Sequence, residues 1–359
     1  MPLFLVILKR LLAAIPTLLA VSILGFALMR FDFGVVEIPW IDGQRHVIAL
    51  KNPIDPLASL KRNPALTIED YERERRRLGL DQPLHIQYGL WLGRLLHFEP
   101  LALAQGRWLD FFKPDLGKNF NNEDVATLLA QRAGNTLLLN ALVILLTWLI
   151  ALPLGVFAAL RWRSLADRAL TLISAVGMAA PRFVVALLVG VWIVKTGWLP
   201  LGGITSDNFT RLGFWDKLGD LAAHLIAPVA VLTFGGIAGL QRQMRGNLLD
   251  VLQSEYVRLA RAKGLPEGRV VYRHAVRTAI NPMITMLGYE FSSLLSGALL
   301  VEMVLNYPGL GQLTYKAALE TDANMVMASL ILSAAMLALG NLLADILLKL
   351  ADPRIEASV

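Results

Sequence analysis

The sequence contains no cysteine among its 359 residues, and only 17% of its residues are charged. The missing thiols exclude disulfides, thiolate metal sites and a cysteine nucleophile. Soluble domains carry about 25% charged residues, so the low charge argues against a soluble enzyme, a disordered tail and a nucleic-acid binder. Hydrophobic residues make up 55% of the chain, above the roughly 45–50% of soluble domains, which points to the membrane.

Sequence signatures of several enzyme classes are also missing. No Gly-x-x-x-x-Gly-Lys-[Ser/Thr] phosphate loop is present, and the nearest fragment, Gly117-Lys118-Asn119, has neither the upstream glycine nor the hydroxyl. The five histidines are scattered without metal-ligand spacing. We therefore expect no catalytic residue, no metal and no cofactor in this chain, and transport is favoured over catalysis.

Six apolar stretches are long enough to cross a membrane, which takes about 20 residues for about 30 Å of hydrocarbon. They cover residues 11–29, 136–160, 169–194, 221–240, 279–301 and 325–350. Pro181-Arg182 interrupts the third stretch midway. The sequence therefore predicts an all-α membrane protein with six transmembrane helices.

Lys and Arg concentrate on one side of these stretches. With the N-terminus inside, the inside segments hold fifteen Lys and Arg, whereas the short outside loops 197–220 and 303–323 hold three. Basic residues in short loops favour the cytoplasmic side. Both termini are therefore expected in the cytoplasm, and the net charge of +6 is a topology signal rather than a nucleic-acid footprint.

The predicted spans divide the chain into four parts. These are the N-terminus and first helix (1–30), an enlarged external, periplasmic domain (31–135), a five-helix core (136–350) and a cytoplasmic tail (351–359). Within the external domain, helical patterns cover 67–78 and 83–96. The domain either binds a partner or only caps the first two spans.

The cytoplasmic loop 241–278 contains an amphipathic pattern over 245–263, predicted to form one helix. Its apolar positions at helical spacing are Leu248, Leu249, Leu252, Tyr256, Leu259 and Ala260. Gly264 is a natural end for this helix, and Pro266 prevents its continuation. A second short helix is expected over 267–277. From the residues alone, this segment is either a docking surface for another protein or a basic loop on lipid headgroups.

The run Tyr256-Val257-Arg258-Leu259-Ala260-Arg261-Ala262-Lys263-Gly264 resembles the EAA coupling loop of ABC importer permeases. It is most similar to the variant in the B-type subunit of dipeptide and oligopeptide permeases. Arg258 departs from the glutamate of many importers. The resemblance implies that the ATPase-coupling residues are Glu255, Tyr256, Arg258, Ala260, Arg261, Ala262, Lys263, Gly264 and Leu265.

Further motifs extend the resemblance along nearly the whole chain. They are Ile15-Pro16-Thr17, Leu78-Gly79-Leu80-Asp81-Gln82-Pro83, Asp115-Leu116-Gly117, Tyr307-Pro308-Gly309-Leu310-Gly311 and Asp352-Pro353-Arg354-Ile355. The resemblance implies a multi-pass subunit of the bacterial inner membrane that forms half of a translocation pathway for di- or oligopeptides. It implies a C-type permease partner, two ABC ATPase subunits that bind ATP and Mg, an extracytoplasmic solute-binding protein and the lipid bilayer.

Two other functions remain open at this stage. A secondary transporter would need inverted repeats and membrane-buried ion sites, and no repeat and few buried carboxylates are visible in the sequence. The other alternative is a membrane scaffold that transports nothing.

Polar residues within the spans are candidates for the translocation path, because charge in a membrane is costly. Arg182 and Glu290 are both expected at about 17–20 Å from the inner face, counting 1.5 Å per residue along straight helices. Either they line the path or they form a structural ion pair. Ser293 and Ser296 either line the same cavity or pack helices closely.

Overall fold

The structure is a computed structural model that describes residues 3–30, 35–41, 44–49, 68–96, 114–119, 121–320 and 322–351. The chain forms two compact units. Unit 1 comprises Met1–Leu12, Ala133–Gln312 and Met336–Val359, and unit 2 comprises Ala13–Arg132 and Leu313–Ala335. The helices α1 (Leu3–Arg30), α6 (Val125–Leu160) and α15 (Ala323–Ala351) each contribute to both units.

Unit 2 contains the predicted helices of the external segment. Helix α3 spans Ile68–Arg77 and helix α4 spans Leu84–Leu95, which confirms the patterns over 67–78 and 83–96. Strands β1 (Val35–Ile41) and β2 (Gln44–Ala49) pair antiparallel. This hairpin is an exception to the expected all-α structure, which is otherwise nearly all helical in the described residues.

An aromatic cluster holds α4 against α1. The rings of Phe26, Tyr88 and Trp91 lie with their centroids 5.5–6.0 Å apart, and the hydroxyls of Ser22 and Tyr88 are 2.8 Å apart. Helix α14 (Leu310–Leu319) precedes α15, where the Asn324 amide donates to the backbone oxygen of Lys118. The segment predicted to be external therefore packs on α1 and α15 within unit 2.

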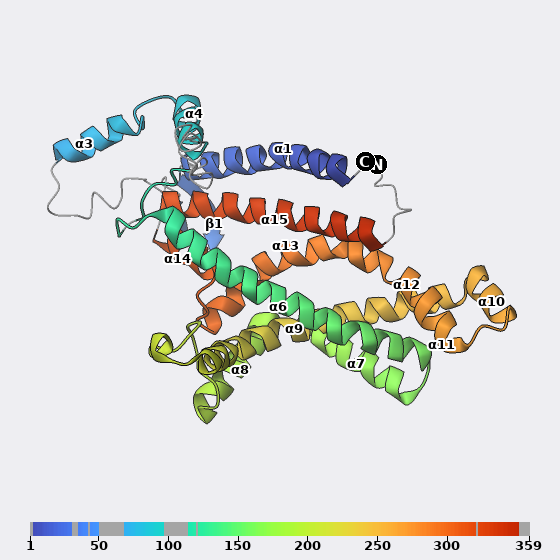
Figure 1. Cartoon of the computed structure of the whole chain (residues 1–359). Coiled ribbons are helices and arrows are strands. Elements are labelled where there is room, and N and C mark those ends of the chain that lie inside the picture. Colours follow the sequence, from blue (N-terminus) through green and yellow to red (C-terminus); the bar gives the residue numbers. More distant parts are fainter. Residues whose placement is uncertain are drawn as a thin grey trace. The chain divides into compact units, whose positions relative to one another are not determined.

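Unit 1 contains the longest helices of the chain (Figure 1). Its elements, besides parts of α1, α6 and α15, are α7 (Leu165–Ala179), α8 (Arg182–Thr196), η2 (Phe209–Arg211), α9 (Phe214–Leu252), α10 (Glu255–Ala262), α11 (Glu267–Arg269), η3 (Val270–Ala275), α12 (Val276–Ala279) and α13 (Asn281–Val304). Helices α7 and α9 lie side by side, and α10 and α11 lie at one end of α9.

Four helices of the described chain are long and apolar enough to cross a membrane. They lie at Ile7–Ala27, Val125–Leu160, Phe214–Leu252 and Ala323–Leu343. Helices α7 and α8 count as a fifth span if they form one together; they meet at a bend of 94°. The bend lies at Pro181, as the sequence predicts, because proline cannot donate the backbone hydrogen bond that a continuous helix needs.

Two apolar clusters hold unit 1 together. The first, which we call the distal cluster because it contains no residue of the 255–265 segment, joins α6, α8, α9 and α13 through buried side chains that include Leu139, Ile193, Leu232 and Val301. The second, which we call the proximal cluster because it contains residues of that segment, joins the other ends of α6 and α9 to α10, η3, α12 and α13. Its members are Ala151, Val156, Ala159, Leu240, Met244, Leu248, Val257, Ala260, Val270, Ala275, Ala279 and Met283.

Helices α6 and α9 approach each other closely at two glycines. A Cβ atom at Gly155 of α6 would lie 2.8 Å from the backbone oxygen of Gln241 on α9. A Cβ atom at Gly236 of α9 would lie 2.9 Å from Thr147 Oγ1 on α6. Small residues at helix contacts let backbones approach within membranes, so these positions set the distance between α6 and α9.

We expect Gly155→Ala to destabilise the protein by about 1–3 kcal/mol, because the added methyl must push α9 away. The matched control is Gly239→Ala on α9, where a Cβ would meet no atom within 4 Å. It should leave stability unchanged or raise it by up to about 1 kcal/mol, because alanine favours helices. Thermal unfolding of the detergent-solubilised chain measures both, and equal midpoints would contradict this packing.

Candidate functional site

The segment predicted to couple to an ATPase, residues 255–265, forms a short helix and a turn that we call the elbow. The predicted single helix over 245–263 is wrong, because α9 ends at Leu252 and α10 begins at Glu255. Ser254 has extended backbone angles, and its hydroxyl donates to the Val251 carbonyl. A serine hydroxyl that bonds the local backbone competes with helical hydrogen bonding, which explains the break.

The elbow ends in the predicted glycine turn. Gly264 adopts a left-handed conformation with φ of 73°. Its N–H donates to the Arg261 carbonyl at 2.9 Å, and the Leu265 N–H donates to the Ala260 carbonyl at 3.4 Å. This pair of bonds is the Schellman motif. A Cβ at Gly264 would meet no atom within 4 Å, so glycine is favoured here by the left-handed backbone conformation and not by crowding.

The elbow presents one face to unit 1 and the other to solvent. Val257 and Ala260 are buried in the proximal cluster with Met244 of α9. Tyr256 and Leu259 are 43% and 55% exposed, whereas Ala260 is buried, so the prediction that these three residues share one face is wrong. The small side chain of Ala260 serves packing within unit 1 and is not available to a partner.

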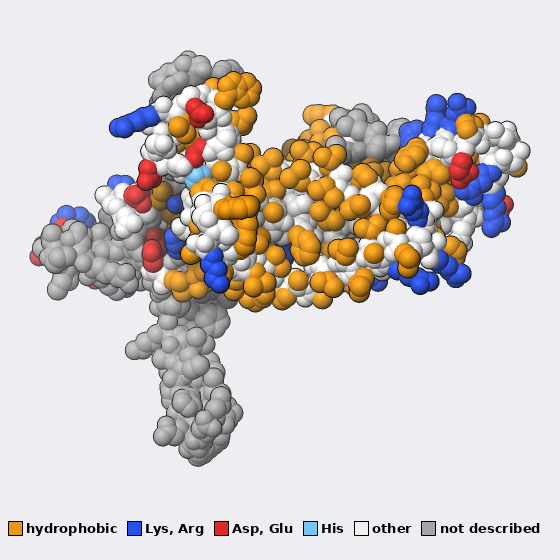
Figure 2. Space-filling model, turned by 90° about the horizontal axis from the view of Figure 1, so that it is seen from below, with side chains coloured by type: hydrophobic (Ala, Val, Ile, Leu, Met, Phe, Trp, Pro, Cys, Tyr) orange, Lys and Arg blue, Asp and Glu red, His pale blue; other side chains and the backbone are white. Residues whose placement is uncertain are grey.

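The exposed face of the elbow combines apolar and basic side chains. The exposed residues of the predicted coupling set are Glu255, Tyr256, Arg258, Arg261, Ala262, Lys263 and Gly264. Leu259 joins them as a residue that the sequence interpretation placed on the wrong face. Figure 2 shows Lys and Arg side chains gathered at the end of unit 1 that carries the elbow.

An ion pair joins the elbow to the helical segment that follows it. The Arg261 guanidinium lies 2.6 Å from the Glu267 carboxylate. This hydrogen bond lowers the pKa of Glu267, so the pair is intact at neutral pH and is lost as the pH falls through that lowered pKa. The segment 267–279 is helical as predicted, with a π-helical turn at Val270–Ala275.

A polar seam between α7 and α9 was missed by the sequence interpretation. Asp167 receives two hydrogen bonds from the Arg245 guanidinium, at 2.5 and 2.8 Å. Further along the same two helices, the Ser174 hydroxyl donates to Gln241 at 2.6 Å. Ser164 caps α7 by accepting from the Asp167 N–H. The pattern Ser164-x-x-Asp167 was a visible sign of a helix start, but the partner Arg245 is distant in sequence.

Arg182 lies at the first position of α8, directly after the bend. A Cβ at Gly235 of α9 would lie 3.2 Å from its Nε atom, so this guanidinium packs over α9 where a larger residue would block it. The 94° bend removes the straight helix on which the predicted depth of Arg182 rests. Glu290, Ser293 and Ser296 lie within α13, but their side chains are outside the described part of the structure.

A buried carboxylate organises the turn between α13 and α14. Glu302 is fully buried and accepts hydrogen bonds from Thr136 Oγ1 at 3.2 Å and from the Gln312 N–H at 2.9 Å. A Cβ at Gly309 would collide with the Glu302 carboxylate. Gly309, in the motif that follows α13, therefore leaves room for this carboxylate.

Residues 135 and 136 belong to this same network and do not begin a helix. The Tyr307 hydroxyl donates to the Asn135 backbone oxygen at 2.8 Å, and the Leu310 N–H donates to Thr136 Oγ1 at 2.8 Å. Burial, with a smaller effect of Glu302, raises the pKa of Tyr307, which keeps the phenol protonated and able to donate. Helix α6 begins at Val125, eleven residues before the predicted span at 136–160, so residue 136 lies inside the helix.

Comparison with known proteins identifies the family. Residues 151–357 match the model for binding-protein-dependent transport system inner membrane components. The chain is 36% identical over 351 residues, 98% of each chain, to the oligopeptide transport system permease protein AppB of Bacillus subtilis. It is 33% identical over 354 residues, again 98% of each chain, to a putative peptide permease protein of Brucella ovis.

A third relative is the oligopeptide transport system permease protein OppB of Mycobacterium bovis. It is 30% identical over 309 residues, which are 84% of this chain and 90% of the relative. The chain belongs to the family of binding-protein-dependent transport system inner membrane components. The expected family and the expected location in the inner membrane are thereby confirmed.

We expect Asp167→Asn to destabilise the protein by about 2–3 kcal/mol, because it leaves the Arg245 guanidinium without its carboxylate. The double variant Asp167→Asn/Arg245→Gln should recover part of this loss, which a double-mutant cycle of thermal unfolding measures. Glu255→Gln is the matched control, since the Glu255–Arg258 pair is exposed at 3.4 Å and exposed pairs contribute little. Additive effects of the two seam substitutions would contradict a coupled pair.

Proposed function

We propose that this chain is the permease subunit of an ATP-driven importer and forms half of a translocation pathway for di- or oligopeptides. The family and its relatives AppB and OppB, both named as oligopeptide transport system permease proteins, support a peptide substrate. The observation that carries the proposal is the elbow, which is anchored in unit 1 by Val257 and Ala260 and exposes Tyr256, Leu259 and its basic side chains.

The elbow suits transmission of a mechanical signal from a docked partner. Its buried residues pack in the same cluster as Met244 and Leu248 of α9, and only two residues separate α10 from α9. Protein interiors are close-packed and transmit displacement rather than absorb it. A partner that pulled on the exposed face of the elbow would therefore move α9.

The proposal includes the topology and the parts of the chain. Six spans follow from the six apolar stretches of the sequence. Both termini lie in the cytoplasm in this proposal, because basic residues are concentrated in the segments on that side. The division into an external domain at 31–135, a five-helix core at 136–350 with the coupling loop 241–278, and a tail at 351–359 belongs to the same proposal. The exposed apolar side chains on α1 and α6, such as Leu24 and Leu149, suit contact with lipid.

The chain requires other subunits to act in this way. We assign ATP and Mg to two ATPase subunits, because the permease sequence has no phosphate-binding loop. A homologous C-type permease would complete the pathway, and an extracytoplasmic solute-binding protein would deliver the peptide. In this scheme the permease itself carries no catalytic residue, metal or cofactor.

The translocation path is assigned to Arg182, Glu290, Ser293 and Ser296. Arg182 lies at the bend between α7 and α8, where the side chain meets Gly235. A basic and an acidic group lining the path would suit the two charged ends of a peptide. The serines follow Glu290 along α13 and could bind peptide amides.

The exposed elbow residues provide a test of ATPase docking. We expect Leu259→Ala to reduce the ATPase that co-purifies with the permease about tenfold, the effect of losing one interface anchor. Gly264→Asp should have a similar effect, because it places a charged side chain on a docking surface in a backbone conformation that favours glycine.

The matched control for this test is Leu218→Ala at the opposite end of α9, where the side chain is 51% exposed, against 55% for Leu259. In the proposed topology residue 218 lies outside the cell, so this substitution should leave ATPase binding unchanged. Equal ATPase recovery with Leu259→Ala and Leu218→Ala would contradict docking at the elbow, whereas uptake without any ATPase would contradict the function itself.

Charge reversal tests the translocation path. We expect Arg182→Glu and Glu290→Arg each to lower uptake of a labelled dipeptide at least about tenfold, because each places the wrong charge in the pathway. If the two residues pair, the double variant should recover part of the uptake. Arg211→Glu in the exposed loop before α9 is the control and should transport normally. Normal uptake by all the variants would exclude these residues from the path.

A further inference from the structure

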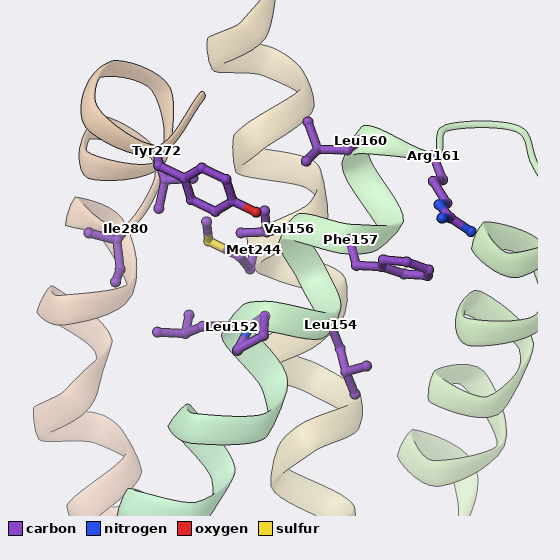
Figure 3. Close-up of a pocket in the computed structure, with 11 residues that line it drawn as sticks. Leu152, Leu154, Val156, Phe157, Leu160, Arg161, Met244, Tyr272 and Ile280 are labelled. Carbon is purple, nitrogen blue, oxygen red and sulfur yellow. The ribbon is translucent and has the colours of Figure 1, made fainter. Parts of the chain in front are cut away.

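A hollow of about 680 Å³ opens on unit 1 beside the end of α6 that approaches the elbow. Figure 3 shows side chains from both flanks of α6 around it, with Tyr272 on one side and Phe157 on the other. Binding pockets for small molecules have volumes of about 300–1,000 Å³, so the hollow is large enough for a substantial ligand. Its lining residues are Leu152, Pro153, Leu154, Val156, Phe157, Leu160, Arg161, Met244, Tyr272, Val276 and Ile280.

The lining is almost entirely hydrocarbon, with one cation at its edge. Arg161 follows α6 directly, and its guanidinium carbon lies 4.5 Å from the centre of the Phe157 ring. Among the described residues no carboxylate forms an ion pair with Arg161. Phe157 and Leu160 are 39% and 45% exposed, so this apolar wall is open to its surroundings.

The length of this hollow along α6, which makes it a groove, matches the thickness of one leaflet of a bilayer. Arg161 lies nine positions after Leu152, which corresponds to about 14 Å along the helix. Half of the hydrocarbon core of a bilayer is about 15 Å thick. A chain lying along the groove with its end beside Arg161 would therefore reach from the headgroup level to the middle of the membrane. Tyr272, which is 64% exposed, would lie near the headgroups, where tyrosine is enriched.

We propose that this groove binds an acyl chain of one anionic phospholipid, with the lipid phosphate on Arg161. A guanidinium binds phosphate through two parallel hydrogen bonds, and basic pockets between transmembrane helices on the cytoplasmic side are suited to anionic headgroups. The lipid belongs to the cytoplasmic leaflet in the orientation proposed above.

Native mass spectrometry of the full-length chain tests the headgroup. Phosphatidylglycerol and phosphatidylcholine with the same acyl chains serve as probes. The wild type should retain phosphatidylglycerol more tightly, and Arg161→Gln should weaken its binding about fivefold, equivalent to about 1 kcal/mol per basic residue at a membrane surface. Arg168→Gln, at an exposed position in the first turn of α7 outside the groove, is the matched control and should have little effect.

The absence of cysteine from the chain provides a test of the acyl chain in the assembled importer. A fluorescent label attached through Leu160→Cys should be quenched more by brominated phosphatidylglycerol than by brominated phosphatidylcholine. The same label attached through Leu149→Cys, on the exposed side of α6 at 65% exposure, should be quenched equally by both lipids.

Several results would overturn the proposal. They are equal retention of the two lipids, equal losses with Arg161→Gln and Arg168→Gln, and protection of the label at residue 160 from both brominated lipids. The last result would mean that another protein subunit covers the groove. Stronger quenching by phosphatidylglycerol at residue 160 alone, together with the selective loss in Arg161→Gln, would support a specific lipid site.

Discussion

Helices α6 and α9 approach so closely at Gly155 and Gly236 that neither position has room for a methyl group. The rest of unit 1 depends on this contact. It brings the ends of both helices into the proximal cluster, which also contains Val257 and Ala260 of the elbow. The elbow is therefore attached to the membrane helices by packing as well as by the chain itself, and any partner that binds it acts on that cluster.

Features set by local chemistry could be predicted from the sequence. Pro181 interrupts its helix because it lacks a backbone N–H, and Gly264 ends α10 because it adopts a left-handed conformation that other residues avoid. The apolar stretches identify the membrane helices because each needs about 20 apolar residues. The helix break at Ser254 also has a local cause, but the amphipathic pattern on both sides of it concealed the change of direction.

Features that depend on partners distant in the chain could not be predicted. Asp167 and Arg245 are 78 residues apart in the sequence. Neither residue, taken alone, can be distinguished from an ordinary charged residue in a loop. The same holds for Glu302, whose partner Thr136 is 166 residues away. The depth of Arg182 is not given by a residue count, because such a count gives a distance only along a straight helix, and α7 and α8 meet at 94°.

The unbroken length of α9 from Phe214 to Leu252 gives the molecule a lever. Its two contacts with α6, at Gly236 and Gln241, place the pivot of a rigid rod near residue 238, with an arm of about 21 Å to Leu252 and one of about 27 Å to Asp220. A stroke of about 2 Å at the elbow end would become about 3 Å at the other end. Under the proposed function, a displacement imposed on the elbow would thus reach the far end of α9 undiminished.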